Sequence, residues 1–186
     1  MQGKKKIFFL ATLTLIGFSA VGIIFLYFFD YYQLTKLFIA HKPNWLQIII
    51  GFIYGTLAAI IGWKIIDSKL MLPVKEKYGN LIGSFGLNKI EIIYISFCAG
   101  FGEEILFRGA IQPYLGVIIT AIIFVAIHGY LNPMNWRVSI YGVFMTGIII
   151  GIGYMSNYYG IVSAIVAHMA IDVVLLYFMT RSDNVN

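Results

Sequence analysis

The chain has 186 residues, of which 60% are hydrophobic and only 11% are charged. A soluble domain is typically about 45–50% apolar and about 25% charged, so this chain has too few polar residues to cover a water-exposed surface. The same composition excludes intrinsic disorder, which needs low hydrophobicity and high charge. The formal net charge of +5 indicates basic cytoplasmic loops rather than a nucleic-acid partner, because Lys and Arg set the orientation of membrane proteins. We therefore expect an integral membrane protein whose main partner is the lipid bilayer.

The first part of the chain predicts two membrane spans followed by a basic loop. The uncharged run 7–29 follows three lysines, and it is longer than the core of a signal peptide and long enough to cross a bilayer. A second run, 45–66, contains Gly51 and Gly55 at the GxxxG spacing that allows close helix contact. Residues 67–89 are polar and basic, which predicts a loop with a short helix at the membrane interface.

The remainder of the chain predicts four more spans, at 90–111, 114–131, 138–155 and 160–180, separated by breaks at Gln112–Pro113, 132–137 and 156–160. Six spans place both termini on one side of the membrane. Most lysines and arginines then lie on that side, whereas Lys36 and Lys42 lie on the other, which predicts cytoplasmic termini. The expected fold is an all-α transmembrane bundle. Segment 1–89 supplies two spans and a basic cytoplasmic loop, and segment 90–186 supplies a four-helix catalytic core.

Ionisable side chains inside the predicted spans are few, and all of them lie in the second segment. The interiors of the first two spans carry none. A charge at the centre of a span costs at least about 2.5–3.5 kcal/mol, so such residues indicate a functional site. The set comprises Glu103, Glu104, Arg108, His128, His168 and Asp172. The remaining histidine, His41, is predicted to lie in a solvated loop.

Helical spacing predicts how these side chains are arranged. Glu104 and Arg108 are four residues apart, so they share a helix face and are expected to pair. Glu103 is rotated by about 100° from Glu104 and therefore points elsewhere. His168 and Asp172 are also four residues apart. A rise of about 1.5 Å per residue puts Glu103 and His168 at similar depths in the membrane, so we expect one buried cluster.

Three segments of this cluster resemble the motifs of one family. Residues 103–108 read EEILFR, 124–128 read FVAIH and 168–172 read HMAID. They are similar to the EExxxR, FxxxH and HxxxN/D motifs of the CPBP family. This family contains the CAAX proteases and bacteriocin-processing enzymes, which are glutamic-type intramembrane endopeptidases with an Abi domain. The resemblance covers about 90–180, and no part of 1–89 resembles a family that we can name.

The resemblance implies that Glu103 and His128 activate the attacking water. His168 and the residue at 172 would stabilise the oxyanion, while Glu104 and Arg108 would hold the site together. The residue chemistry agrees, because a carboxylate in a water-poor site is a stronger base and donors aimed at developing negative charge lower the barrier. Asp172 stands where the eukaryotic branch of the family has Asn. An ionised Asp is a poor oxyanion donor, so Asp172 would instead orient His168, carry a proton or bind metal.

A metal-dependent mechanism is the alternative within the same site. His128, His168 and Asp172 would supply three ligands and leave one open position, as in catalytic zinc sites, and Glu103 would then be the base. The more specific HExxH pattern is absent from the sequence. We expect a mechanism without a cofactor, and a divalent metal such as Zn²⁺ stays the alternative.

The predicted function is hydrolysis of a peptide bond in a membrane-associated or hydrophobic protein or peptide. The small size and the lack of a soluble domain favour the cytoplasmic membrane of a prokaryote. Two other functions fit buried Glu and His residues. One is a non-proteolytic CPBP-like immunity or scaffold protein, and the less favoured one is a small proton-coupled transporter. The sequence leaves the substrate, the side on which the site opens and the oligomeric state undetermined.

Overall fold

The computed structural model describes residues 2–40 and 42–182, so the predicted loop position of His41 lies outside the described residues. Within these ranges the chain forms helices joined by short connections, with no strand. The first span is one long helix with a π-helical turn in its middle. The elements of the first segment are α1 (Gln2–Leu13), η1 (Thr14–Phe18), α2 (Ser19–Phe29), α3 (Tyr31–Lys36), α4 (Asn44–Ile66), η2 (Lys69–Met71) and α5 (Leu72–Gly83).

The second segment begins at a capping box. The Asn88 side chain accepts a hydrogen bond from the Glu91 backbone N–H, and the Glu91 carboxylate accepts one from the Asn88 N–H. This exchange satisfies N–H groups that the first helical turn leaves unpaired. The elements that follow are α6 (Lys89–Glu104), the π-helical η3 (Ile105–Ile111), α7 (Gln112–Ile127), α8 (Trp136–Tyr159) and α9 (Ile161–Ser182).

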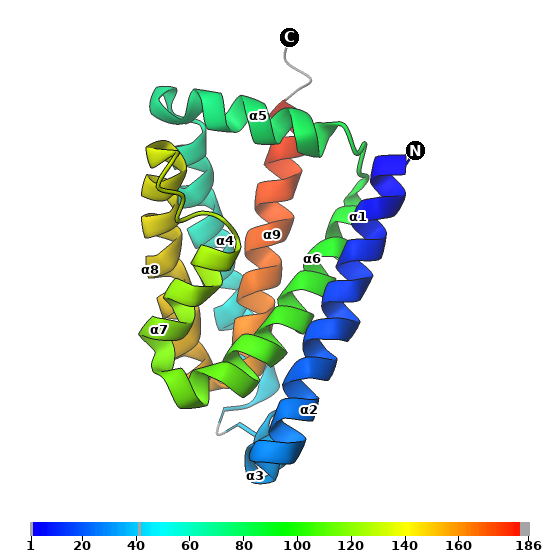
Figure 1. Ribbon diagram of the computed structural model, residues 1–186, viewed down its shortest axis with the longest axis vertical. Helices are drawn as coiled ribbons and strands as arrows, with labels where there is room; N and C mark the ends of the chain where they lie inside the picture. Colours follow the sequence, from blue (N-terminus) through cyan, green and yellow to red (C-terminus); the bar gives the residue numbers. More distant parts are fainter. Residues whose placement is uncertain (1, 41, 183–186) are drawn as a thin grey trace.

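Five helical stretches of the described residues are long and apolar enough to cross a membrane: Gly3–Phe29, Asn44–Ile66, Lys89–Ile127, Trp136–Tyr159 and Ile161–Arg181. The third stretch contains two of the predicted spans. It reverses its direction, so that α7 runs back alongside α8 (Figure 1). The start of α1 and the end of α9 consequently lie at the same end of the bundle (Figure 1). The expected all-α transmembrane bundle of about six spans is confirmed.

The reversal occurs at a different residue from the one that the sequence predicts. The expected break at Gln112–Pro113 is wrong, because Ile111 and Gln112 keep right-handed helical angles and the helix continues through Pro113. The non-helical residue is Gly116, at φ 75° and ψ 169°. A positive φ of this kind is accessible to glycine at little cost, so the chain turns there.

The predicted span 114–131 is too long at its far end. Helix α7 ends at Ile127, and Gly129 leaves the helix with a φ of 75°. The helix therefore stops part-way along the bundle (Figure 1). Its last turn places His128 inside the bundle rather than at the membrane surface.

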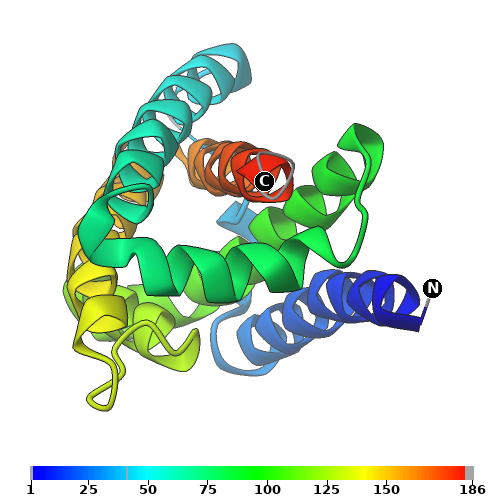
Figure 2. The same ribbon diagram turned by 90° about the horizontal axis from the view of Figure 1, so that it is seen from above.

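Helix α5 is the short helix that the sequence predicts within 67–89. It runs across the end of the bundle at which α1 begins and α9 ends (Figure 1). Seen from this end, α9 occupies the middle of the molecule, with α4, α5, α6 and α8 around it (Figure 2). The bundle therefore has a central helix that is covered at one end by α5.

Small residues bring α4 onto this central helix. A Cβ atom at Gly51 would overlap the backbone oxygen of Ser163, and one at Gly55 would overlap that of Ala167. The GxxxG pair thus works as predicted, by letting two helix backbones approach closely. The helices on the two sides of residue 89 consequently pack as one bundle, and the predicted domain boundary there stays a prediction.

Candidate active site

The fold brings the six predicted site residues together around the middle of α9. Glu103 and Glu104 end α6, Arg108 lies in η3, and His128 directly follows α7. His168 and Asp172 lie one turn apart on α9. The residues therefore come from α6, η3, the end of α7 and α9, which meet inside the bundle.

Glu104 forms the buried centre of this cluster. Arg108 Nε donates to Glu104 Oε2 at 2.8 Å, and both side chains are 0% exposed. The other carboxylate oxygen, Oε1, lies 2.9 Å from His168 Nδ1. A carboxylate next to a guanidinium accepts hydrogen bonds only, so Nδ1 of His168 carries the proton. The predicted ion pair is confirmed, and Glu104 also fixes the orientation of the His168 ring.

Glu103 faces the opposite way and has a different set of neighbours. Its Oε2 lies 3.3 Å from His128 Nε2 and 4.0 Å from His168 Nε2. This oxygen is buried and has no hydrogen-bond partner among the described residues. The separation of Glu103 from Glu104 thus follows the rotation predicted for adjacent helical residues.

The tautomer of His128 defines the gap beside Glu103. His128 Nδ1 lies 2.7 Å from the backbone oxygen of Phe124, and a carbonyl oxygen can only accept, so Nδ1 donates. In a neutral imidazole the lone pair then lies on Nε2, which faces Glu103. Two acceptors that face each other at 3.3 Å leave room for a shared proton but not for a water molecule between them. A water that lies beside the pair can donate to either group, so the arrangement is suited to accepting a proton from it.

Asp172 lies on the accessible side of the cluster. Its Oδ2 is 3.6 Å from His168 Nε2, and its side chain is 29% exposed. The His128 side chain is 31% exposed, whereas those of Glu103 and His168 are 10% and 8% exposed. Asp172 also lines a cavity of about 150 Å³ together with Tyr130 and Tyr141. The cluster is therefore reached from this cavity, which extends beneath α5 through Val74, Tyr78 and Ile82.

Phe124 connects the two histidines, a role that the sequence did not reveal. Its ring stacks on His128 with centroids 4.4 Å apart and meets His168 edge-on at 5.6 Å. The guanidinium carbon of Arg108 lies 5.5 Å from the same ring. The spacing of one helical turn between Phe124 and His128 was the available signal, but the contact with His168 depends on how α7 and α9 cross.

Gln112 extends the Arg108 network and was also missed. Arg108 Nη1 lies 3.5 Å from Gln112 Oε1, while Gln112 Nε2 donates to Asn157 Oδ1 at 2.8 Å and to the Gly153 oxygen at 3.1 Å. Glu104, Arg108 and Gln112 follow one another at four-residue steps, which is the signal that could have found it. The π-helical turn of η3 through this stretch is typical of functional sites, and no sequence pattern predicted it.

A metal ion in the cluster would need its ligands arranged around one point. Among residues 2–40 and 42–182, no group of three or more His, Cys, Asp or Glu side chains is arranged to hold a metal ion. The alternative ligand set of His128, His168 and Asp172 stays a prediction. Asp172 lies nearest to His168.

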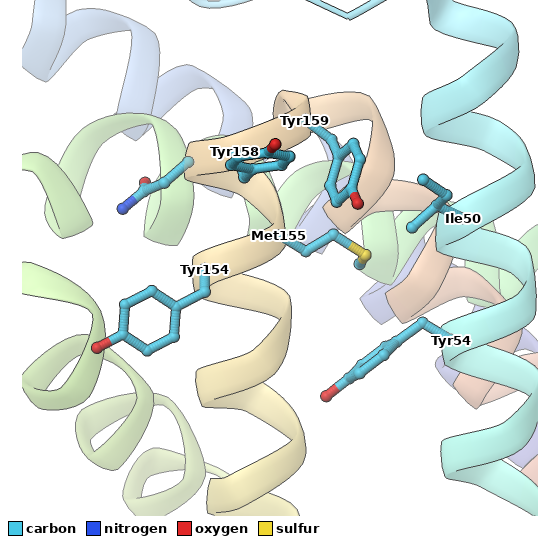
Figure 3. A pocket seen from close by; sticks show the side chains of 7 residues that line it. Ile50, Tyr54, Tyr154, Met155, Tyr158 and Tyr159 are labelled. Atoms are coloured by element: carbon cyan, nitrogen blue, oxygen red, sulfur yellow. The ribbon is translucent and has the colours of Figure 1, made fainter.

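A larger groove lies elsewhere on the bundle, between α4 and α8. It measures about 590 Å³ and is lined mainly by aromatic side chains, among them Tyr54, Tyr154 and Tyr158 (Figure 3). None of the six predicted site residues lines it. Its position on the outer surface and its apolar lining are suited to contact with lipid, and it contributes nothing to the cluster.

Comparison with known families agrees with the motifs. Residues 86–174 match the Rce1-like family model, described as type II CAAX prenyl endopeptidase Rce1-like. This segment, which is a little under half of the chain, is similar to the Rce1-like family. The match confirms the resemblance to the CPBP and CAAX proteases, and it includes all six residues of the cluster. No curated protein and no solved structure matches the chain. The Rce1-like family is generally a family of membrane proteases, and the apolar helical stretches support an integral membrane protein.

Proposed function

We propose that this Rce1-like chain is an intramembrane endopeptidase that hydrolyses a peptide bond in a membrane-associated or hydrophobic protein or peptide. One observation carries the proposal: a buried carboxylate oxygen of Glu103 has no hydrogen-bond partner among the described residues and faces His128 Nε2 at 3.3 Å. A water molecule beside this pair can give its proton to either group. The rest of the cluster supports this pair without competing for it.

The reaction follows from the proton-accepting groups. Glu103 takes a proton from the water, and the oxygen of that water bonds to the carbonyl carbon of the substrate. The proton then passes to the nitrogen of the scissile bond, with His128 sharing the transfer, and the carbon–nitrogen bond breaks. Positioned acid–base groups of this kind contribute about 10²–10⁴-fold to a rate.

His168 is suited to stabilise the negative charge that develops on the carbonyl oxygen. Its Nδ1 is fixed by Glu104 at 2.9 Å, so Nε2 is the edge that turns toward the reacting groups. A donor oriented before the reaction needs no reorganisation during it. Asp172, at 3.6 Å from Nε2, holds a proton on His168 and does not donate itself, because an ionised carboxylate is only an acceptor.

The cavity beneath α5 is the proposed route of the substrate. Its lining is mostly apolar, with Ile66, Leu175 and Met179 beside Asp172, which suits a hydrophobic peptide. The cavity lies toward the end of the bundle that carries both chain termini (Figure 1). With the termini in the cytoplasm of a prokaryote, as the positive charges predict, the substrate enters from the cytoplasmic side.

The decisive experiment measures cleavage of a defined peptide library by the purified protein, with mass spectrometry of the products. Glu103→Gln and His128→Ala are expected to lower the cleavage rate by about 10²-fold or more, because each removes an acid–base group. Glu76→Gln is the matched control, since Glu76 is an exposed glutamate on α5. Full cleavage by Glu103→Gln contradicts the proposal. In that case a non-proteolytic immunity or scaffold role explains the chain better.

The proposed reaction uses no cofactor, and the same assay tests this. Dialysis against a chelator is expected to leave the cleavage rate unchanged. A loss that is restored by added Zn²⁺ contradicts the metal-free mechanism, and it assigns His128, His168 and Asp172 as ligands in a rearranged site.

A further inference from the structure

Helix α5 covers the cavity that leads to the cluster. Val74, Tyr78 and Ile82 are spaced four residues apart, so they form one stripe along the helix, and all three line the cavity that Asp172 also lines. Figure 2 shows α5 passing across the end of the bundle beside α9. The cavity measures about 150 Å³, whereas pockets that hold an organic ligand measure about 300–1,000 Å³. An extended peptide therefore does not fit beneath α5 in this conformation.

The packing of α5 onto the bundle is weak. Of its residues, all of which the structure describes, only Gly79 is buried. The side chains that line the cavity are only partly covered, and Tyr78 is 37% exposed. Helix α9, by contrast, buries Ala164, Ala167 and Ile171. Elements with few buried apolar contacts open locally while the rest of a protein stays folded. Helix α5 is therefore the wall of the cavity that moves most easily.

Two polar contacts hold the ends of α5. Near its start, Lys75 Nζ lies 2.7 Å from Asp67 Oδ1 and 5.5 Å from the centre of the Trp63 ring. Trp63 lies in α4, and Asp67 directly follows that helix. Just beyond the end of α5, Lys4 Nζ of α1 donates to the Gly86 oxygen at 3.2 Å. Both contacts lie at the surface, where ion pairs contribute little, so they hold α5 in place without fixing it.

We propose that α5 is a lid that moves away from the cavity to admit the substrate, and that the Lys75–Asp67 pair holds it closed. The purpose of the lid rests on the proposed function, because it controls access to the reacting groups. The motion itself needs no cleavage and is measured separately. Weak contacts suit such a lid, since opening then takes little free energy while the closed state still predominates.

The test measures how fast a cysteine beneath α5 reacts with two neutral maleimides, in the full chain in detergent. In the parent protein, Cys98→Ala removes the native cysteine and Leu175→Cys places a probe in the cavity. N-methylmaleimide is small enough for the closed cavity. A maleimide with a polyethylene glycol chain is too large, so it reacts only when α5 moves away. Val174→Cys is the matched control, because Val174 is the neighbouring residue on α9 and does not line the cavity.

We expect the large reagent to label the parent slowly and to label it about two- to fivefold faster when Lys75→Gln is added, as the loss of one exposed ion pair predicts. Lys75→Arg keeps the charge and the slow rate. Glu76→Gln changes an exposed residue next to Lys75 and leaves the rate unchanged. Leu176→Cys, which lines the same cavity, is the second probe if Leu175→Cys fails to fold.

Three results overturn the proposal. They are no reaction with the large reagent in any variant, equal rates in Lys75→Gln and Lys75→Arg, and an equal acceleration at Val174→Cys, which indicates general loosening of the bundle. Failure of the proposed proteolysis looks different. Labelling that depends on Lys75 in a chain whose Glu103→Gln variant still cleaves supports the lid and contradicts the proteolytic role of Glu103. Cleavage that needs Glu103, with labelling independent of Lys75, contradicts the lid alone.

Discussion

The first and last membrane-spanning segments are both strongly apolar, yet they have different surroundings. The segment formed by α1, η1 and α2 lies at the edge of the bundle, and Phe9, Ile16 and Phe28 are exposed along it. Helix α9 runs through the middle (Figure 2), and Ala164 and Ala167 on it are completely buried. The first span has the exposed apolar surface of a lipid-facing helix, and α9 has the buried surface of a helix surrounded by protein.

The difference shows which sequence features distinguish a lipid-facing helix from a central one. Apolarity identifies both as spans, because lipid and a protein core are equally favourable for apolar side chains. Helix α9 adds small residues, which let α4 approach its backbone, and ionisable residues, which need partners inside the bundle. The interior of the first span, from α1 to α2, carries no ionisable residue, and this span packs against α6 and η3.

The largest loss of stability is expected from Glu104→Gln, which changes a charge inside the bundle. This change leaves the guanidinium of Arg108 buried without a counter-charge, which costs about 3–5 kcal/mol of the free energy of unfolding. Denaturant unfolding in detergent micelles measures it. The matched control is Asp67→Asn, which breaks the exposed pair with Lys75 at 2.7 Å and costs at most about 1 kcal/mol. Equal losses in the two variants contradict a buried Glu104–Arg108 pair.

An intermediate effect is expected where α4 meets the central helix. Gly55→Leu places a side chain against the backbone of Ala167, and overpacking of this kind costs about 1–3 kcal/mol. Because α9 carries His168, cleavage activity is expected to fall together with stability. Gly147→Leu on α8 is the control, since nothing lies within 4 Å of a Cβ at Gly147. If both leucine variants unfold alike, the close packing of α4 on α9 is wrong.

The smallest effect on the free energy of unfolding is expected on the lipid-facing surface of the first span, from α1 to α2. Ile16 is 63% exposed, so Ile16→Ala changes the free energy of unfolding by no more than about 0.5 kcal/mol. The same substitution at Ile171, which is 3% exposed in α9, costs about 2–5 kcal/mol because it leaves a cavity. A large loss of stability in Ile16→Ala shows that the first span is covered by protein. It then removes the contrast between this span and α9.

The sequence predicted those features that depend on neighbours along the chain. Long apolar runs located the spans, and a spacing of four residues predicted the Glu104–Arg108 pair. The predicted turn at Pro113 is wrong, because the helix continues through this proline and bends at Gly116. The length of α7 was overestimated, since apolar residues continue to Leu131 while Gly129 ends the helix.

The sequence by itself therefore determined that this is a helical membrane protein with one buried ionisable cluster, because hydropathy and helical periodicity act over short stretches. The tertiary structure decided which partner each charge has. Glu104 is joined to His168, and Glu103 is left facing His128, because α6, α7 and α9 cross at this level. It also left Nη2 of Arg108 buried without a hydrogen-bond partner among the described residues. Such pairings depend on how distant helices pack, and no local spacing encodes that.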